Sequence, residues 1–174
     1  MGIADNSAGT TVYVADTSNG MIRQITGGYV TTLAGMFGAG FLDGTGSGAI
    51  FNYPEGLALD ASGNVLVADN SNGRLRQVTT VGVVTTLVSG MSSDAAVVLD
   101  DAGNYYLTMA ANNIIVRYTK APAVVRNFLA GWSSGYADGT GTGASFYQPY
   151  GIVFDGTDTL YIADTHNNEI RQIK

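Results

Sequence analysis

Short apolar runs and polar turns alternate along this chain in a pattern that returns four times. In each copy a short apolar run leads into a polar tract, and a run of alternating apolar and polar residues follows. This arrangement predicts a strand, a turn and a second strand. The four copies align without gaps as TVYVADTSNGMIRQIT (11–26), NVLVADNSNGRLRQVT (64–79), NYYLTMAANNIIVRYT (104–119) and TLYIADTHNNEIRQIK (159–174).

Further apolar runs flank each predicted hairpin. The runs that precede it are GIAD (2–5), GLALD (56–60), AVVLD (96–100) and GIVFD (151–155), and those that follow it are YVTTLAG (29–35), VVTTLV (83–88) and VVRNFLAG (124–131). Each unit is therefore predicted to be a four-stranded antiparallel meander, and successive meanders bury their faces by stacking radially. We expect an all-β chain, a β-propeller in a single domain (1–174). Its blade-like repeats cover 2–35, 56–89, 94–131 and 151–174, with the last one incomplete.

Two long loops, 36–55 and 132–150, separate repeats and resemble each other. They carry DGTGSGAIF and DGTGTGASF, in which we expect each aspartate to open a tight turn and each phenylalanine to anchor the loop. Long loops on a rigid scaffold are common sites of partner binding. Loop length and aromatic content nominate five binding positions: Phe41, Asp43, Trp132, Tyr136 and Asp138.

A carboxylate closes the first strand of three hairpins, and an arginine follows it seven residues later. The pairs are Asp16 with Arg23, Asp69 with Arg76, and Asp164 with Arg171. The third repeat loses both members together, as Met109 and Val116, which indicates a structural pair across the hairpin. A carboxylate that recurs once per repeat is a poor candidate for a unique catalytic acid. An asparagine also recurs in every hairpin turn, where we expect the left-handed backbone that asparagine tolerates, at Asn19, Asn72, Asn112 and Asn167.

Composition and charge exclude some classes of binding partner. The net charge is −6 and the eight basic residues are scattered, which argues against nucleic acid. No apolar stretch approaches the ~20 residues of a membrane span, so we expect no membrane insertion. The absence of cysteine excludes disulfides and thiolate metal sites. The absence of cysteine does not decide the cellular compartment. Few Lys and Glu beside many Thr, Asn and Gly favour an extracellular or cell-surface location.

The sequence offers little catalytic chemistry. His166 is the sole histidine, and a catalytic zinc site needs about three protein ligands. The Gly-rich loops lack the lysine of a phosphate-binding loop and carry one carboxylate each, too few for a calcium loop. We therefore expect no enzyme, no bound metal and no cofactor.

The segments VYVADTSNGMIRQI, VLVADNSNGRLRQV and LYIADTHNNEIRQI, preceded by F-x-x-P-x-G-(apolar)-x-(apolar)-D, resemble the NHL repeat family. The resemblance implies a propeller, typically of six blades, that serves mainly as an interaction platform. It also implies zinc-binding histidines in the amidating lyase members and a basic face in the RNA-binding members, and this chain lacks both. Related lactonase-type propellers hold calcium with a Glu/Asn/Asp set, to which no residue here can be matched.

Two interpretations of the four repeats stay open. The chain is a partial propeller completed by further blades, or it closes through homo-oligomerisation with a second copy. The leading function is a non-enzymatic scaffold that binds a protein or glycan partner. The alternatives are a calcium-dependent lactonase-like hydrolase and a self-assembling surface or filament subunit.

Overall fold

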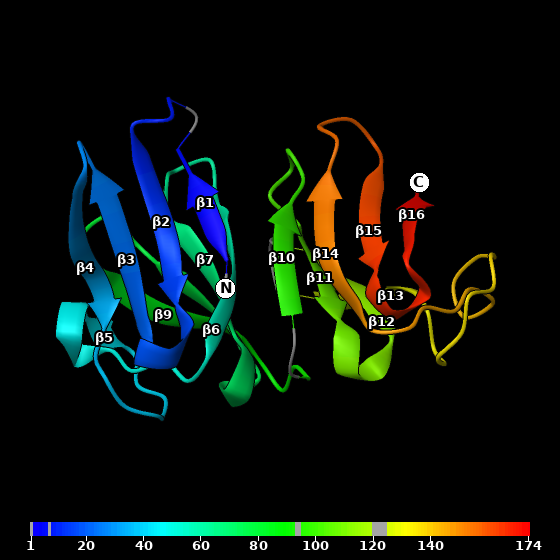
Figure 1. Cartoon of the computed structure of the whole chain (residues 1–174), viewed down its shortest axis with the longest axis horizontal. Helices are drawn as coiled ribbons and strands as arrows, with labels where there is room; N and C mark the ends of the chain where they lie inside the picture. Colours follow the sequence, from blue (N-terminus) through cyan, green and yellow to red (C-terminus); the bar gives the residue numbers. More distant parts are fainter. Residues whose placement is uncertain (1, 7, 93–94, 120–124) are drawn as a thin grey trace. The chain divides into compact units, whose positions relative to one another are not determined.

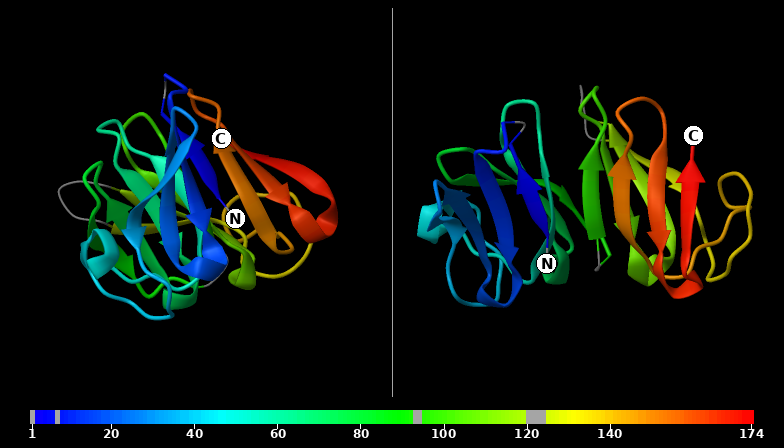
Figure 2. Two further views of the ribbon diagram at one scale, coloured as in Figure 1. Left: turned by 60° about the vertical axis from the view of Figure 1, so that its left-hand side comes forward. Right: turned by 45° about the horizontal axis from the view of Figure 1, so that its top comes forward.

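The computed structural model describes residues 2–6, 8–92, 95–119 and 125–174. Residues 94 and 120–124 of the predicted third repeat lie outside this description. The chain divides into two compact units, Met1–Met91 and Ser92–Lys174. The described residues form four antiparallel sheets, two in each unit, joined by turns and short 3-10 segments. Figure 1 and the turned views of Figure 2 show the sheets of each unit lying face to face.

The first unit holds two sheets. The first sheet has the order β1-β2-β3-β4 and the second the order β5-β9-β8-β7-β6. Strands of the first sheet are β1 (Ile3–Asp5), β2 (Thr11–Asp16), β3 (Met21–Thr26) and β4 (Tyr29–Gly35). Those of the second are β5 (Gly44–Thr45), β6 (Pro54–Leu59), β7 (Val65–Asp69), β8 (Arg74–Val78) and β9 (Val83–Ser89). The two-residue strand β5, which belongs to the long loop 36–55, extends a sheet that the pattern predicts with four strands.

The second unit repeats this plan. The third sheet has the order β10-β11-β12-β13 and the fourth the order β14-β15-β16. The strands are β10 (Ala95–Leu99), β11 (Tyr105–Met109), β12 (Ile114–Thr119), β13 (Val125–Ala130), β14 (Pro149–Phe154), β15 (Leu160–Asp164) and β16 (Glu169–Ile173). The fourth sheet therefore has three strands among the described residues.

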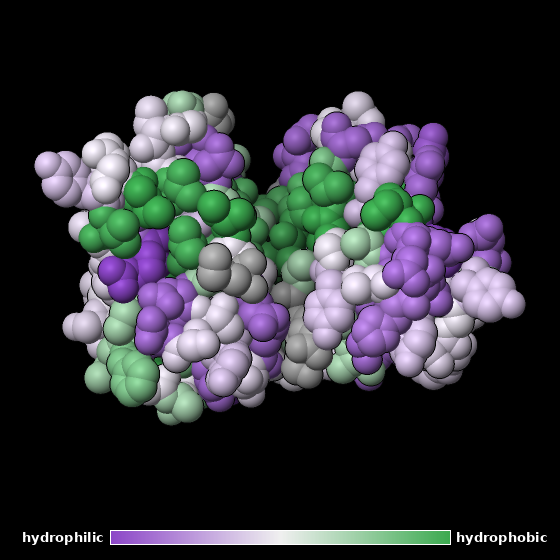
Figure 3. Space-filling view, viewed as in Figure 1, coloured by the Kyte–Doolittle hydropathy of each residue, from purple (hydrophilic) through white to green (hydrophobic). Residues whose placement is uncertain are grey.

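Each unit has an apolar core between its sheets. In the first unit, Ile22, Ala34, Phe51 and Val67 are fully buried in one cluster. In the second, Ile115, Phe146 and Ile162 occupy the corresponding cluster. Burying side chains from both facing sheets supplies the main stabilisation of such layers. Figure 3 shows other hydrophobic side chains gathered over the first sheet, where Ile3 and Val30 are exposed.

In the hairpin turns, the residue with positive φ is not the recurring asparagine that the sequence predicts. Each turn is a 3-10 segment: Thr17–Asn19, Asn70–Asn72, Ala110–Asn112 and Thr165–Asn167. The left-handed residue is the next one along: Gly20, Gly73, Asn113 and Asn168, with φ between 58° and 65°. The prediction of positive φ at the recurring asparagine is therefore wrong. In the three repeats that have a carboxylate at the end of the preceding strand, the asparagine side-chain amide donates to it, as Asn72 does to Asp69 at 2.8 Å.

Candidate functional site

Arg76 fastens the long loop 36–55 to the second sheet. Its side chain is fully buried on β8 and donates from Nη1 to Asp69 Oδ2 at 2.8 Å and from Nη2 to Asp43 Oδ1 at 2.6 Å. It also donates to the carbonyls of Leu42 (2.9 Å) and Ile50 (3.2 Å). A guanidinium has donors directed in a fixed fork, so one side chain can hold both ends of the Gly-rich loop.

Asp69 is the buried partner of this ion pair. Its carboxylate accepts from Arg76 and Asn72 at Oδ2 and from the Asn52 N–H at Oδ1, the last at 2.8 Å. Burial raises the pKa of the Asp69 carboxyl, and these three hydrogen bonds offset only part of that effect. Both oxygens of the Asp69 carboxylate thus accept hydrogen bonds from the protein itself, which argues against a contact with a substrate.

Asp43 joins the loop to the outer strand β9 as well. Its Oδ2 accepts the Thr86 N–H and its Oδ1 accepts the Thr86 hydroxyl, both at 3.0 Å. Partial burial raises the pKa of Asp43, but the hydrogen bonds from Arg76 and Thr86 outweigh it and hold the pKa below the usual value. Asp43, predicted as a binding position, is therefore occupied by two partners within its own unit.

The second unit contains the same arginine clamp, in which one arginine contacts the carboxylate at the end of a strand and the aspartate of the long loop. No counterpart of Thr86 contacts the loop aspartate among the described residues. Arg171 on β16 donates from Nη1 to Asp164 Oδ2 at 3.1 Å and from Nη2 to Asp138 Oδ1 at 2.5 Å. Asp164 is buried, while the Asp138 side chain is 95% exposed against 44% for Asp43. Among the described residues, Arg171 is the one donor to the Asp138 carboxylate. In the first sheet, Asp16 and Arg23 form a looser pair at 3.5 Å.

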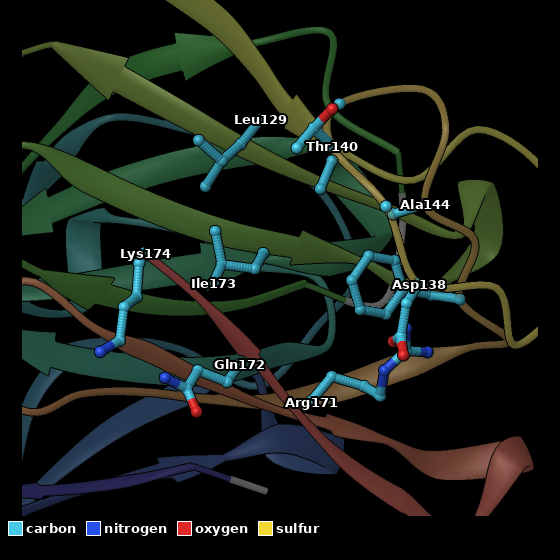
Figure 4. A pocket seen from close by; sticks show the side chains of 12 residues that line it. Leu129, Asp138, Thr140, Ala144, Arg171, Gln172, Ile173 and Lys174 are labelled. Carbon is cyan, nitrogen blue, oxygen red and sulfur yellow. The ribbon is translucent and has the colours of Figure 1, made fainter.

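A pocket of about 390 Å³ opens beside Asp138. One side is formed by the Gly-rich segment 138–141 and the other by the end of β16, Arg171 to Lys174. Leu129, Ala130, Ala144 and Phe146 complete the lining. Figure 4 shows Leu129 and Thr140 on one side of the opening and Gln172 and Lys174 on the other. The pocket lining combines apolar side chains with one exposed carboxylate.

The three aromatic positions predicted for binding differ in exposure. Trp132 is 72% exposed and lies edge-on to Phe128, with ring centroids 6.2 Å apart. Tyr136 is 78% exposed. Phe41 is 46% exposed, and the Arg74 guanidinium lies 3.6 Å from its ring centroid. The loop 132–150 thus presents its rings more openly than the loop 36–55 presents Phe41.

Sequence reasoning missed the residues that make the pocket. None of Leu129, Thr140 and Ile173 was nominated as a binding position, and they come from three separate segments. The available signal was the repeated Gly-rich motif DGTGTGASF, which contains Thr140.

Catalytic chemistry is sparse in the part of the chain that the structure describes. It contains no group of three or more His, Cys, Asp or Glu side chains that could hold a metal. His166 is exposed in its turn and lies edge-on to Tyr147, with ring centroids 4.9 Å apart. None of the described helices is long and apolar enough to cross a bilayer.

Comparison with known proteins identifies the class. Residues 51–78 match the model of the NHL repeat. The fold class is an all-β propeller, and the resemblance to NHL-repeat β-propellers is confirmed. The match begins at Phe51, in the core of the first unit, and runs through the Asp69–Arg76 pair to the end of β8.

One relative and three solved structures are similar over most of the chain. The chloroplastic protein SUPPRESSOR OF QUENCHING 1 of Arabidopsis thaliana is 30% identical over 157 residues, which cover 77% of this chain and 15% of that protein. A protein of unknown function from Bacteroides thetaiotaomicron matches 98% of this chain and 46% of its own, with TM-score 0.79 and 18% identity. An auxiliary nutrient binding protein from Bacteroides ovatus matches 99% and 47%, with TM-score 0.72 and 16% identity. Virginiamycin B lyase from Staphylococcus aureus matches 99% and 69%, with TM-score 0.62 and 17% identity.

The chain spans about half the length of the two Bacteroides structures and a small part of the plant protein. At identities of 16–18% the structural matches establish the fold alone.

Proposed function

We propose that this chain is a non-enzymatic binding module that holds a protein partner on the loop 132–150. The observation that carries the proposal is the pair of exposed rings, Trp132 and Tyr136, on a loop whose base is fixed. Arg171 holds the Ala137 carbonyl at 3.1 Å, and Asn167 holds the Gly135 carbonyl at 2.6 Å. Exposed Trp and Tyr on a rigid base are the side chains that dominate protein interfaces.

The loop 36–55 offers a second, smaller surface in the first unit. Phe37 is 73% exposed and Phe41 is 46% exposed. Because Arg74 already covers one side of the Phe41 ring, this loop has less free aromatic surface to offer. The main contribution to binding is therefore assigned to Trp132 and Tyr136.

A glycan is the second candidate partner. The similarity to an auxiliary nutrient binding protein favours it, and aromatic rings present an apolar body beside a polar edge, which suits a sugar ring. The two candidates predict the same residues and differ in the ligand.

Trp132 is the sole tryptophan, so its fluorescence reports directly on this loop. The experiment screens an oligosaccharide panel and a displayed peptide library, and then titrates each hit against Trp132 emission. We expect a hit that shifts the emission and shields Trp132 from iodide quenching. Tyr136→Ala should weaken it about tenfold or more.

Tyr29→Ala is the matched control, because Tyr29 is 80% exposed but lies on β4 in the first unit. It should leave the affinity unchanged. Hits that bind without altering Trp132 emission, or that Tyr136→Ala leaves intact, would overturn the assignment to this loop.

The hydrolase alternative requires a calcium ion. Against it, Asp69 and Asp164 are held by arginines on the neighbouring strands, and Asp43 and Asp138 contact the same arginines. We expect the melting temperature to be the same in calcium and in chelator. A calcium-dependent rise would favour the hydrolase.

Self-assembly into an oligomer or filament makes a different prediction. The outer face of the fourth sheet carries an apolar groove of about 340 Å³ that includes Val153, Tyr161 and Ile170. Native mass spectrometry separates the alternatives. An 18.0 kDa species at all concentrations supports the binding module, and concentration-dependent growth supports assembly.

A further inference from the structure

The long loop of the first unit begins with seven residues that carry no polar side chain. Residues 36–42 have the sequence MFGAGFL, and we call this segment the apolar tip. Its four large side chains, Met36, Phe37, Phe41 and Leu42, are all exposed. In Figure 1 the chain between β4 and β5 projects beyond the end of β4. Exposed apolar side chains that gather in one place mark a contact site for a protein or a membrane.

Polar contacts hold the base of the apolar tip in place. Asn72 Nδ2 donates to the Gly40 carbonyl at 2.6 Å, and Arg76 Nη2 donates to the Leu42 carbonyl at 2.9 Å. Leu42 also exchanges two backbone hydrogen bonds with Ile50, at 3.1 and 3.3 Å. Because these backbone groups are already paired, placing the tip in a medium poor in water costs less free energy. The fixed base also leaves less conformational entropy to be lost on binding.

A positive charge lies beside the apolar tip. The Arg74 guanidinium lies 3.6 Å from the centroid of the Phe41 ring and donates from Nη1 to the Asn72 carbonyl at 2.9 Å. Arg74 forms no ion pair with a carboxylate among the residues that the structure describes. At a bilayer surface the lipid phosphates lie next to the acyl boundary, so a cation beside an apolar segment complements their charge.

The corresponding segment of the second unit has a different chemistry. It has the sequence WSSGYA (132–137), with two serine hydroxyls and a tyrosine hydroxyl. Specific protein interfaces carry about one hydrogen bond per 100–200 Å², and such side chains can supply them. The apolar tip has no side-chain donor or acceptor, and the acyl boundary of a bilayer requires none. The composition of the tip therefore favours lipid over protein.

We propose that the apolar tip docks shallowly into the surface of a phospholipid bilayer. Phe37 and its apolar neighbours enter the boundary between headgroups and acyl chains, and the Arg74 guanidinium pairs with a lipid phosphate. An anionic surface would repel a chain of net charge −6, so the proposed partner is a zwitterionic lipid such as phosphatidylcholine. Shallow docking requires no membrane span of ~20 apolar residues. It does not rest on the function proposed for Trp132 and Tyr136.

The first test measures partitioning of the whole chain onto phosphatidylcholine vesicles by co-sedimentation. We expect saturable partitioning that Phe37→Ser weakens about tenfold or more, because the burial of one phenylalanine is lost. Tyr29→Ser is the matched control, since Tyr29 is exposed but begins β4, at the opposite end of that strand from the tip. It should change partitioning by no more than about twofold. Circular dichroism checks that each variant is folded.

Arg74 is tested by two substitutions. Arg74→Gln removes the charge and should weaken partitioning about twofold to fivefold. Arg74→Lys keeps the charge and should stay within about twofold of the parent. Equal weakening by both variants would overturn the pairing of Arg74 with a lipid phosphate.

The second test places a reporter in the apolar tip. Trp132 is the sole tryptophan, so Phe37→Trp combined with Trp132→Phe confines the emission to the tip. We expect a blue shift when vesicles are added, and quenching by phosphatidylcholine that is brominated on its acyl chains.

Three outcomes would overturn the proposal. The first is that the folded chain does not partition, or that Phe37→Ser partitions equally, which would leave the tip to a protein partner. The second is vesicle binding without quenching by the brominated lipid. The third is lipid-free self-association that Phe37→Ser abolishes, because a second copy would then cover the tip.

Discussion

The guanidinium of Arg76 donates from Nη2 to Asp43 Oδ1 across 2.6 Å and so ties the loop 36–55 to the second strand of the hairpin that follows it. Arg171 and Asp138 repeat this contact in the second unit. In each unit one arginine thereby contacts both the aspartate that ends the preceding strand, Asp69 or Asp164, and a long loop. The loop aspartate lies more than thirty residues before the arginine in the sequence.

The first prediction concerns Arg76 itself. Arg76→Ala leaves Asp69 buried and charged, so the free energy of unfolding should fall by about 3–5 kcal/mol. Arg23→Ala should cost about 0–1 kcal/mol, because the Asp16–Arg23 pair is partly exposed and 3.5 Å long. Urea unfolding of both variants checks the order. Equal losses would mean that burial does not set the strength of these pairs.

The second prediction replaces the Asp69–Arg76 pair by the residues of the third repeat, which has Met109 and Val116 at the equivalent positions. Asp69→Met combined with Arg76→Val removes both charges and replaces them with apolar side chains. Since a buried charge is no longer left alone, the double variant should be more stable than Arg76→Ala by about 1–3 kcal/mol. A double variant that is less stable than Arg76→Ala would refute the pairing.

The third prediction tests the packing of the turn before β9 against β4. Gly28 and Gly82 both precede an outer strand and have φ of +83° and +80°. A Cβ at Gly82 would lie 2.5 Å from the Leu33 carbonyl oxygen, whereas one at Gly28 would meet nothing within 4 Å. Gly28→Ala should cost about 1–2 kcal/mol for the backbone alone. Gly82→Ala should cost roughly 1–3 kcal/mol more, because the strand must move. Equal denaturation midpoints would contradict this contact.

The fourth prediction concerns acid stability at the turn between β14 and β15. The N–H groups of Thr157 and Thr159 donate to Asp155 and lower its pKa from 3.8 to about 2. Because the folded-state pKa is the lower one, the carboxylate stabilises the fold above about pH 4, and this contribution is lost as the pH falls through about 2. The stability difference between the parent and Asp155→Ala should therefore be full at pH 6, fall as the pH drops below about 4, and vanish only below pH 2. A carboxyl titration with its midpoint at or above 3.8 would contradict the assignment.

Much of the fold could be predicted from the repeats, because alternation and turn residues specify strands locally. The same comparison paired Asp69 with Arg76, since both disappear together in the third repeat. The comparison of repeats could not predict the contact between Asp43 and Arg76, because this contact depends on how the long loop between them folds back. The recurring asparagines were assigned the wrong backbone conformation, because the residue that follows each of them takes the left-handed position. The pocket was not predicted, since its lining comes from three segments that are separate in the sequence.

That the long loop is fastened to the following hairpin is tested most directly by a double-mutant cycle on Asp43 and Arg76. The free energies of unfolding of Asp43→Ala, Arg76→Ala and the double variant give the coupling between the two side chains. A charged hydrogen-bonded pair of this geometry predicts a coupling of about 1.5–3 kcal/mol. A coupling near zero would mean that Arg76 stabilises its own sheet without holding the loop.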